Sequence, residues 1–566
     1  MLAVRWGACS SSGIKPINQD CQKLTVPDFA VLQRRGIVAC IADGISSSQV
    51  SQYASELAVT QFNRDYLLTS DNWSAARAAQ NVLKTINTAL YVKTAQSPYQ
   101  GNPDRGYVCT FSSLILHQDC ATVVHCGDST ILHCRDEVIT TLTRAHTGES
   151  ESGQTYLANA LGIKPELDVD IHSMAVQPGD KFILMTDGVS EFVDAQTLFD
   201  QMPASEAQLT EYCEEVIEQA LAAGSSDNLT IQVLAVTGVT SDLNIAFDDN
   251  GFLPRVTQPT IGTNIDDWHL TKCLHRSDRS EVFVAQHQTS QQMAILKVPA
   301  TTHIDNAGFL DDMAKEEWVA RMVDNPHLMK AVSHDTPRSA FYTLTEYLEG
   351  QTLQQHLLDN GQASVQQVRD WASQLVAGLT ALHRKGVLHQ DLRPENLLLT
   401  SSDRVIIIDF GSASIHGHNF LEDPNQLMIP GDLLYSAPEY FVGLWANEQA
   451  DQFSLTSILY YALSGAHPYG TAVAKTTSYS ALHKLRYQRL LQRDVSVPVW
   501  LDETVKRGCH PQAAKRYPSL SELLYDLQHP NPAYQQTLPL AERNPVKFWQ
   551  GISAVLAALL ALSLIR

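Results

Sequence analysis

Basic residues are scarce in this sequence. Its 566 residues include 40 Lys and Arg against 61 Asp and Glu, which gives a net charge of −21 at pH 7. A surface that binds nucleic acid or anionic lipid through bulk positive charge is therefore not expected, and we expect no nucleic-acid partner. The apolar content of 44% is ample for packed cores.

The sequence also lacks a disulfide framework and a secretion signal. Its ten cysteines follow no regular spacing, a pattern typical of reduced thiols in a cytosolic protein. The opening residues MLAVRWGACS contain no apolar core of the length that a signal peptide needs. We therefore expect both halves of the chain to lie on the cytoplasmic side.

Internal repeats are absent as well, and the length predicts two or three domains. Two stretches rich in Pro, Asn, Asp and Gly show no sustained hydrophobic period and indicate linkers. The expected order along the chain is a domain at 1–237, a linker at 238–266, a second domain at 267–528, a linker at 529–546 and an apolar segment at 547–565.

The C-terminal apolar segment has few interruptions. As a helix, the run FWQGISAVLAALLALSLI at 548–565 would span about 27 Å, close to the thickness of a bilayer core. Lys547 and Trp549 stand where interface anchors belong, and Arg566 follows the run. These features predict a transmembrane helix over 547–565, a single-pass anchor with both domains cytoplasmic. A buried core helix is the alternative.

The most informative motifs lie in the second half. The strings VLHQDLRPENLLLT (387–400) and VIIIDFGSAS (405–414) place Asp391, Asn396 and Asp409 at a spacing that phosphoryl transfer can use. Asp391 can accept the proton of an attacking hydroxyl, while Asn396 and Asp409 can hold divalent cations on the phosphates. With AILK upstream and SAPE downstream, these strings resemble the catalytic core of Ser/Thr protein kinases.

This resemblance covers about 268–528 and implies a bilobal fold that uses ATP and Mg2+ to phosphorylate Ser or Thr of proteins. It implies that Lys297 holds the α/β-phosphates and that Glu316 is its helix partner. Arg393 would keep a positive charge near the transferring phosphate. Three further residues would brace the catalytic loop and the activation segment: Asp451, Glu439 and Arg516.

The kinase-like half departs from the family pattern in two places. His275, Ser277 and Ser280 stand where the nucleotide loop normally has glycines, so close approach of backbone N–H groups to phosphates is hindered. Gln390 replaces the Arg that commonly reads a phosphate on the activation loop, so such phosphorylation is not expected to gate activity. The sequence therefore predicts weak ATP binding, and a pseudokinase that docks or regulates the first half is the alternative.

The first half predicts mixed α and β structure with acids at strand ends. Apolar runs and helical periods indicate strands at 36–42, 111–116, 122–126 and 181–185 and helices at 49–68 and 73–95. Small residues flank four aspartates at strand ends: Asp43 in ADG, Asp128 in GDS, Asp187 in TDG and Asp227 in SDN. If the carboxylates converge, they repel one another unless hard cations such as Mg2+ or Mn2+ neutralise them. Two such ions could activate water and clamp a phosphate ester.

The order of these strings resembles the PPM family of metal-dependent type-2C Ser/Thr phosphatases, from Gly13 to about Val236. The resemblance rests on GIKPINQD, ADG, HCGDST, LTRAH, PGDKFILMTDG and SSDNLT. It implies an α/β sandwich of two β-sheets flanked by helices. It also implies a role for each site residue. Asp43 would bridge two metal ions, the Gly44 carbonyl would bind one of them, Asp187 and Asp227 would complete one site, Asp20 would serve the second ion and Asp128 would help form a third site.

Some positions differ from that pattern. Lys15 stands where Arg often grips the substrate phosphate, so bidentate recognition is lost. Gln19 replaces a common Glu, and Ile45 replaces a His that some members use as a general acid. The pairs His125-Cys126 and His133-Cys134 could suggest zinc, but their alternation in adjacent strands favours structural positions.

The whole sequence thus predicts an α+β multidomain protein with two opposed activities. One half would phosphorylate Ser or Thr of proteins, and the other would hydrolyse such phosphates with two or three divalent ions. Because both halves share one chain, the kinase-like half is itself a candidate substrate of the phosphatase-like half.

Overall fold

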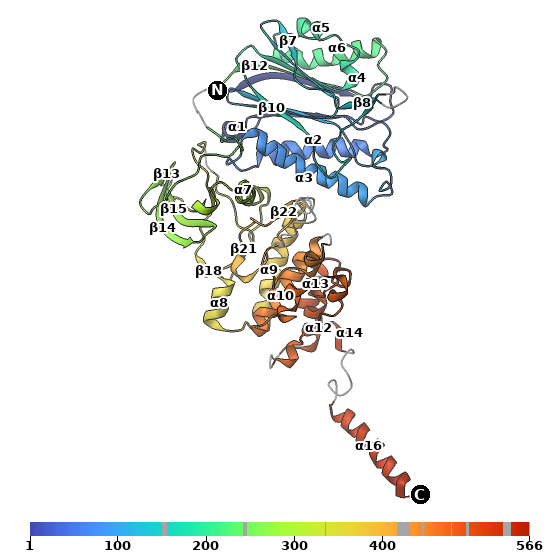
Figure 1. Ribbon diagram of the computed structural model, residues 1–566, viewed down its shortest axis with the longest axis vertical. Helices are drawn as coiled ribbons and strands as arrows, with labels where there is room; N and C mark the ends of the chain where they lie inside the picture. The colour runs from blue at the N-terminus through green and yellow to red at the C-terminus, as the bar shows by residue number, and fades with distance from the viewer. Residues whose placement is uncertain are drawn as a thin grey trace. The chain divides into compact units, whose positions relative to one another are not determined.

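The computed structural model is α+β and has two compact units (Figure 1). It describes residues 1–149, 155–240, 246–333, 336–415, 431–443, 446–476, 478–493, 497–535 and 545–564. The first unit comprises Met1–Val323, Lys330–Tyr347 and Ser414–Glu422, and the second comprises Asp324–Met329, Leu348–Ala413 and Asp423–Arg566. The first unit thus joins the whole N-terminal half to the first strands and helix of the C-terminal half.

Two five-stranded sheets form the sandwich of the N-terminal half. One has the order β1 (Ala3–Ser11), β12 (Leu229–Gly238), β11 (Lys181–Met185), β6 (Thr130–Arg135) and β7 (Val138–Thr141). The other has the order β10 (Asp170–Ala175), β5 (Cys120–Cys126), β4 (Phe111–His117), β3 (Ile37–Ala42) and β2 (Cys21–Thr25). A hairpin of β8 (Thr147–Glu149) and β9 (Thr155–Leu157) stands apart. The predicted sandwich and its predicted strands are confirmed.

Helices cover both outer faces of this sandwich (Figure 1). On the β3 side lie α1 (Phe29–Arg35), α2 (Ser51–Leu67) and α3 (Ala75–Ala95), and on the β12 side lie α4 (Asp187–Ser190), α5 (Ala195–Gln201) and α6 (Leu209–Ala222). Between the sheets, Phe182, Leu184 and Leu234 pack against Ile41 and Leu114 in one apolar cluster. The two long predicted helices are confirmed, and Ser74 caps α3 by accepting a hydrogen bond from the Arg77 N–H.

A five-stranded antiparallel sheet begins the C-terminal half within the first unit. Its order is β13 (Asn264–Ile265), β14 (Trp268–Arg276), β15 (Ser280–His287), β16 (Met293–Pro299) and β17 (Thr343–Glu346). Helix α7 (Ala307–Met322) lies between β16 and β17 in the sequence. The sheet buries Trp268, Phe283, Leu296 and Leu344 in one core.

The second unit is mainly helical. Its helices are α8 (Leu353–Asn360), α9 (Val365–His383), α10 (Glu448–Ser464), α11 (Tyr479–Leu482), α12 (Val499–Gly508), α13 (Leu520–Gln528), α14 (Pro532–Gln535) and α16 (Pro545–Leu564). Its short strands are β18 (Gly350–Thr352), β19 (Val387–Leu388), β20 (Leu397–Thr400) and β21 (Val405–Ile407). Strand β22 (Ser414–Ile415) belongs to the first unit. A small β-rich part followed by a larger α-rich part is the order that the sequence predicts.

The stretch that the sequence indicates as a linker at 238–266 packs in its described part. Phe252 and Leu253 are fully buried, and the backbone N–H of Ser74 donates to the Gly251 carbonyl at 2.8 Å. Residues 241–245, and 536–544 of the second predicted linker, lie outside the described residues.

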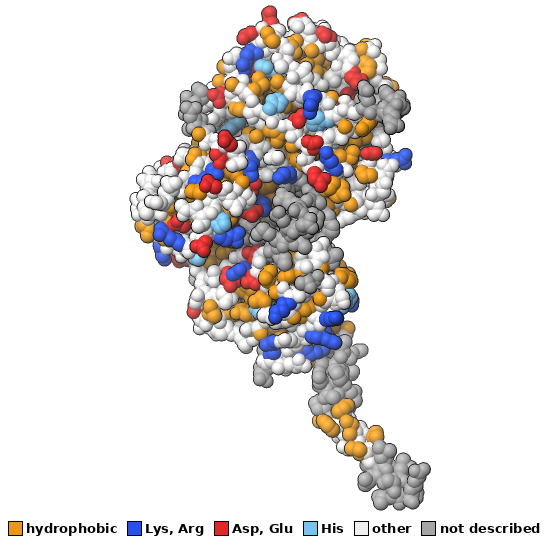
Figure 2. All heavy atoms as spheres, in the orientation of Figure 1, with side chains coloured by type: hydrophobic (Ala, Val, Ile, Leu, Met, Phe, Trp, Pro, Cys, Tyr) orange, Lys and Arg blue, Asp and Glu red, His pale blue; other side chains and the backbone are white. Residues whose placement is uncertain are grey.

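The C-terminal helix α16 is confirmed as a helix, but its predicted role as a membrane span is not supported. No helix in the part of the chain that the structure describes is both long and apolar enough to cross a membrane. Figure 2 shows hydrophobic side chains along the start of α16, where Val546 and Trp549 are exposed. The predicted transmembrane helix at 547–565 and the predicted membrane partner are therefore not supported.

Candidate functional site

Strand ends position the predicted carboxylates of the N-terminal half. Asp43 directly follows β3, and Asp187 opens α4, with Thr186 between it and the end of β11. Asp128 lies in the turn between β5 and β6, and Asp227 lies just before β12. The Gly44 N–H donates to the carbonyl of Gln19 at 3.2 Å, which fixes the chain after Asp43.

Burial and mutual repulsion raise the pKa of these carboxyl groups. The pKa of Asp43 is raised well above its ordinary value by burial first and then by the charge of Asp20. Burial, followed by repulsion from Asp227, also raises the pKa of Asp187. Burial, with a contribution from Asp187, raises the pKa of Asp20 and of Asp128 to about 6. The five carboxylates therefore lie near enough to repel one another when ionised.

Asp20 is held in place by two hydroxyl groups. Its Oδ2 accepts hydrogen bonds from Thr186 Oγ1 at 3.0 Å and from Thr230 Oγ1 at 2.7 Å. Its Oδ1 is buried and has no hydrogen-bond partner. A buried carboxylate oxygen without a partner is costly, unless a cation or a water completes its shell.

Lys15 contacts one of the predicted metal ligands. Its Nζ forms an ion pair with Asp227 and donates a hydrogen bond to Ser46 Oγ at 2.9 Å. A substrate phosphate would therefore compete with Asp227 for this ammonium group. The predicted role of Lys15 in binding the substrate phosphate stays a prediction.

Gln19, one of the departures from the family pattern, has a structural use. Its Nε2 donates to the Ser48 carbonyl at 2.8 Å and to Ser51 Oγ at 2.7 Å, at the start of α2. A carboxylate has no hydrogen to donate, so Glu could not make these two bonds. Gln19 thus holds the segment that carries Gly44 against α2.

The oxygen atoms of these carboxylates are suitable ligands for hard divalent cations, although the side chains are not arranged around a common point as in a bound metal site. Among the described residues, no three or more His, Cys, Asp or Glu side chains are grouped as a ready metal-binding set. The carboxylates nevertheless offer only oxygen ligands, and Asp20 Oδ1 is unpartnered. Oxygen ligands of this kind suit Mg2+ or Mn2+. The ligand roles of Asp20, Asp43, Gly44, Asp128, Asp187 and Asp227 stay predictions.

The two histidine–cysteine pairs have structural partners. His125 bonds to Ser112 Oγ at 2.8 Å and to the Arg144 carbonyl at 3.1 Å, and burial lowers its pKa to about 4. The His133 ring stacks on Phe182 and lies 3.3 Å from Asp180. The structural interpretation of both pairs therefore holds over the zinc alternative.

In the C-terminal half, the first unit brings Lys297 and Glu316 together. Lys297 Nζ on β16 donates to Glu316 Oε2 on α7 at 2.7 Å. The predicted pair of strand lysine and helix glutamate is therefore formed.

The second unit assembles the remaining predicted catalytic residues. Asn396 Nδ2 donates to the Asp391 carbonyl at 2.9 Å and to Asp391 Oδ2 at 3.0 Å. Burial raises the pKa of Asp391, and the charge of nearby Asp409 adds to the effect. Asp409 and Gln390 have φ angles of 64° and 65°, a conformation that costs energy in residues other than glycine and concentrates at active sites.

Arg393 is surrounded by acids. Its Nε donates to Glu395 Oε2 at 3.0 Å, and a second nitrogen lies 3.6 Å from Asp432 Oδ2. The Asp432 N–H also donates to Asp391 Oδ1 at 3.1 Å. Arg393 and Asp391 thus share Asp432 as a neighbour, which places the positive charge next to the predicted base.

The predicted braces are also formed. Two Arg516 nitrogens donate to the two Glu439 carboxylate oxygens at 2.7 Å each, and the pair is buried. Asp451 accepts from the backbone N–H groups of His389 and Gln390 at 2.9 and 3.0 Å. These bonds fix the loop that leads into Asp391.

Comparison with known proteins agrees with this geometry. The family model "Protein kinase domain" matches residues 269–536, and the family model "Protein phosphatase 2C" matches residues 17–231. The chain contains a type-2C phosphatase domain and a protein kinase domain. Both are enzyme domains, and neither model alone covers half of the chain.

Curated relatives match the kinase domain. The serine/threonine-protein kinase PknD of Mycobacterium tuberculosis (strain ATCC 25618 / H37Rv) is 28% identical over 265 residues, which is 47% of this chain and 40% of that protein. The serine/threonine-protein kinase PknH of the same organism is 27% identical over 263 residues, 46% of this chain and 42% of that protein. The match thus spans less than half the length of these relatives.

Solved structures resemble each domain. The M. tuberculosis PknI kinase domain covers 48% of this chain and 98% of its own, at 22% identity and a TM-score of 0.38. The PstP phosphatase catalytic domain, solved with two manganese ions, covers 42% of this chain and 100% of its own, at 22% identity and a TM-score of 0.34.

The nucleotide loop of the kinase domain, around Ser277–Ser280, makes hydrogen bonds within itself. Ser277 Oγ accepts hydrogen bonds from the backbone N–H groups of Arg279 at 3.3 Å and Ser280 at 3.1 Å. The Ala300 N–H donates to the Arg279 carbonyl at 2.9 Å. Two amide donors that a phosphate would need are thus occupied by a side chain.

Sequence reasoning missed several residues that surround these sites. Thr186 and Thr230 position Asp20, Glu191 adds to the repulsion on Asp128, and Asp432 contacts Asp391. Thr186 stands in the TDG string, so its position next to Asp187 is the feature of the sequence that could have indicated its role. Thr230 ends the SSDNLT string that contains Asp227, so that string was the signal for it. Asp432 lies in no such string, and its contact with Asp391 joins two segments that are distant in the sequence.

Proposed function

We propose that this protein is a bifunctional signalling enzyme that phosphorylates Ser or Thr of proteins with ATP and hydrolyses phospho-Ser or phospho-Thr with divalent cations. The observation that supports the proposal is that residues predicted for each of the two activities lie close to one another in the structure. Lys297 contacts Glu316 and Asn396 contacts Asp391 in the kinase domain. In the phosphatase domain, burial and then repulsion between neighbouring carboxylates raise the pKa of Asp20, Asp43, Asp128 and Asp187.

In the phosphatase domain, the chain supplies carboxylates at fixed strand ends. Two bound Mg2+ or Mn2+ ions would supply a nucleophile at neutral pH and neutralise the phosphate ester. Asp43, Asp187 and Asp227 would hold them, Asp20 and Asp128 would assist, and Gly44 would offer its carbonyl. Thr186 and Thr230 orient Asp20 for that role. Lys15 would turn from Asp227 to the substrate phosphate.

In the kinase domain, Lys297 would hold the α/β-phosphates while Glu316 fixes its ammonium group. Asp391 would accept the proton of the substrate hydroxyl as that oxygen attacks the γ-phosphate. Asn396 and Asp409 would hold Mg2+ on ATP, and Arg393 would face the transferring phosphate. Because Asn396 already donates to Asp391, the base is oriented before substrate binds.

A second function is favoured by the nucleotide loop. With the Arg279 and Ser280 amides bound to Ser277 Oγ, the loop offers few donors to phosphate. In that alternative the kinase domain is a pseudokinase that docks or regulates an active phosphatase. Lys297, Asp391, Asn396 and Asp409 would then have no catalytic use, which is why we place this function second.

Proteins bearing Ser, Thr or their phosphorylated forms are the proposed partners, and the kinase domain of the same chain is one candidate substrate. The need for ATP and the ten unpaired cysteines support a cytoplasmic location of both domains.

A transfer assay with the full chain tests the proposal. In an Asp187→Ala background, which prevents loss of label, radiolabelled ATP should label the protein on Ser or Thr, and Asp409→Asn should abolish the label. No transfer at millimolar ATP would favour the pseudokinase. Phosphopeptide hydrolysis by the wild type, in turn, should stop on chelation of divalent cations.

A further inference from the structure

Helix α7 of the kinase domain is held from two sides. Its Glu316 pairs with Lys297 on β16, while its next residue, Glu317, faces the phosphatase domain. Glu317, Trp318 and Val319 are all buried, although a helix at a protein surface would expose part of such a run. Both neighbours lie in the same compact unit. The position of α7 therefore depends on the phosphatase domain as well as on the kinase sheet.

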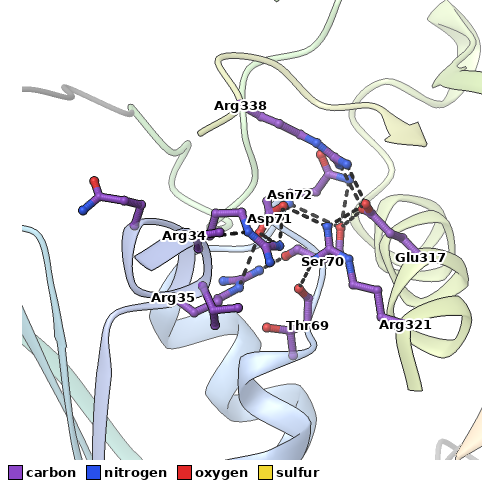
Figure 3. A network of polar contacts seen from close by, with 12 residues as sticks. Arg34, Arg35, Thr69, Ser70, Asp71, Asn72, Glu317, Arg321 and Arg338 are labelled. Carbon is purple, nitrogen blue, oxygen red and sulfur yellow. Dashed lines mark hydrogen bonds and ion pairs between the residues drawn. The ribbon is translucent and has the colours of Figure 1, made fainter. Parts of the chain in front are cut away.

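Glu317 is the centre of the contact (Figure 3). Its Oε2 accepts from Ser70 Oγ of the phosphatase domain at 2.7 Å and from Arg338 at 2.9 Å. Its Oε1 accepts from Arg338 at 2.5 Å and from Arg321 at 2.8 Å. Burial alone would raise the pKa of Glu317, but Arg321 and Arg338 outweigh it and lower the pKa to about 2. The carboxylate is thus ionised, buried and fully paired.

The phosphatase domain meets α7 with the segment between its helices α2 and α3. Arg321 donates to the Thr69 carbonyl at 2.7 Å and to Asp71 Oδ2 at 2.9 Å (Figure 3). Asn72 Nδ2 donates to the Tyr342 carbonyl at 2.9 Å, and its Oδ1 accepts from the Tyr342 N–H at 3.2 Å. These hydrogen bonds use backbone and side-chain groups of both the phosphatase domain and the kinase domain. They therefore fix which residues of the two domains face each other.

Two further contacts extend along α7. Trp318 Nε1 donates to the Asp65 carbonyl at 3.0 Å, and its ring lies 5.8 Å from that of Trp73 in an edge-on arrangement. Near the start of α7, Arg77 Nε donates to Asp311 Oδ1 at 2.8 Å and a second nitrogen pairs with Asp311 Oδ2. The phosphatase domain therefore contacts α7 at Asp311, Glu317, Trp318 and Arg321, over about three turns.

This contact lies away from the carboxylate cluster. Helix α2 begins beside Gly44, whose added Cβ would meet the Ser51 side chain at 2.9 Å. The 17 residues of α2 span about 25 Å before the chain reaches Thr69. Changes in the metal-binding carboxylates are therefore separable from changes in the contact with α7.

We propose that the phosphatase domain is a built-in positioning element of the kinase domain, which grips α7 so that Glu316 stays on Lys297. The proposal rests on the proposed kinase function for its consequence, since Lys297 must be oriented to hold nucleotide phosphates. ATP binding by the kinase domain then depends on the folded phosphatase domain and not on its phosphatase activity. Glu317, Trp318 and Asp311 are positioning residues in this scheme.

The positioning proposal can be tested in the full chain by exchanging the charges of the ion pair between Arg77 and Asp311. Arg77 and Asp311 are partly exposed, so Arg77→Glu can fold. The variant should raise hydrogen exchange of α7 amides about fivefold or more and raise labelling of Lys297 by an amine-reactive reagent to a similar degree. The KM for ATP should rise more than kcat falls. The double variant Arg77→Glu/Asp311→Arg should restore all three values.

The matched control is Lys164→Glu, which reverses a charge in another exposed ion pair of the phosphatase domain, with Asp168. It should leave α7 exchange unchanged. Trp318→Phe, which keeps an aromatic ring but is smaller and lacks the N–H that bonds to Asp65, should act like Arg77→Glu. Equal α7 exchange in Arg77→Glu, Trp318→Phe and Lys164→Glu would overturn the proposal. If the wild type transfers no phosphate, the kinase function fails, but exchange and Lys297 labelling still decide the positioning role.

Discussion

The hydroxyl of Ser277 accepts a hydrogen bond from the backbone N–H of Ser280 at 3.1 Å, at the point where the kinase domain would meet the phosphates of ATP. The same hydroxyl donates to the Ser280 carbonyl at 3.1 Å. The Ser277 side chain therefore bonds both the N–H and the carbonyl of Ser280. This local bond, more than the missing glycines as such, is the physical reason to expect weak nucleotide binding.

Replacing Ser277 should strengthen ATP binding. Ser277→Gly frees the Arg279 and Ser280 amides, and each amide that then bonds a phosphate contributes about 1 kcal/mol. We expect the KM for ATP to fall about fivefold if one amide bonds a phosphate and about thirtyfold if both do, with kcat little changed, measured by initial rates of peptide phosphorylation. Ser290→Gly, in the turn between β15 and β16, is the control. An unchanged KM in Ser277→Gly would show that the loop amides do not limit binding.

Breaking the Arg516–Glu439 pair should destabilise the second unit. Both charges are buried and joined by two bonds of 2.7 Å, so Arg516→Ala leaves an uncompensated carboxylate and costs about 3–5 kcal/mol. Hydrogen exchange of α10 amides, Glu448–Ser464, reports the loss as faster opening. Arg404→Ala, at an exposed position, should change the opening free energy by less than about 0.5 kcal/mol. A similar value for both variants would contradict the prediction.

Local patterns predicted the fold well, because the signals lie within single elements. The apolar run at 36–42 becomes β3, and the helical period at 73–95 becomes α3. The strings that contain Asp391, Asn396 and Asp409 are equally local, and the catalytic roles that they predict stay predictions. The C-terminal run is a helix as predicted, but no described helix meets the length and hydropathy of a membrane span.

Contacts between distant segments could not be predicted in this way. Glu317 reads as an ordinary surface glutamate beside Glu316, yet it is buried against Ser70 and Arg338. Its partners lie 247 and 21 residues away in the sequence. Only the packing of α7 on the phosphatase domain brings them together, so no local pattern of charge or hydrophobicity records the contact.

Removal of divalent cations should abolish phosphatase activity. Asp43 is half-buried among like charges, and Asp43→Ala removes the carboxylate that the resemblance assigns to both ions. We expect phosphopeptide hydrolysis to fall at least about 1,000-fold in Asp43→Ala and in Asp187→Ala, an effect of about 4 kcal/mol on the barrier. Hydrolysis by the full chain that survives both chelation and Asp43→Ala would contradict a metal-dependent mechanism.

The raised pKa of Asp20 predicts how pH and metal ions act on stability. Its folded-state pKa of about 6 exceeds the ordinary value of 3.8, so between these values the folded state binds more protons than the unfolded state. Without metal, this carboxyl therefore favours folding at low pH, and its contribution is lost as pH rises through about 6. At pH 7.5 the ionised group costs about 3 kcal/mol, a cost that a bound cation would offset.

Asp20→Asn should remove that pH dependence. In chelator at pH 7.5, the variant should melt at a higher temperature than the wild type, because its side chain is neutral. At pH 5 the difference in melting temperature should narrow to about half, because the folded-state carboxyl is then mostly protonated while the unfolded one is still mostly ionised, and the difference should close only near pH 3.8. Mn2+ should stabilise the wild type more at pH 7.5 than at pH 5, and should stabilise Asp20→Asn less than the wild type at pH 7.5. Asp104→Asn, at an exposed position, is the matched control. If Asp20→Asn melted below the wild type in chelator at pH 7.5, the Asp20 carboxylate would be a stabilising partner of its two threonines and not a group that requires a cation.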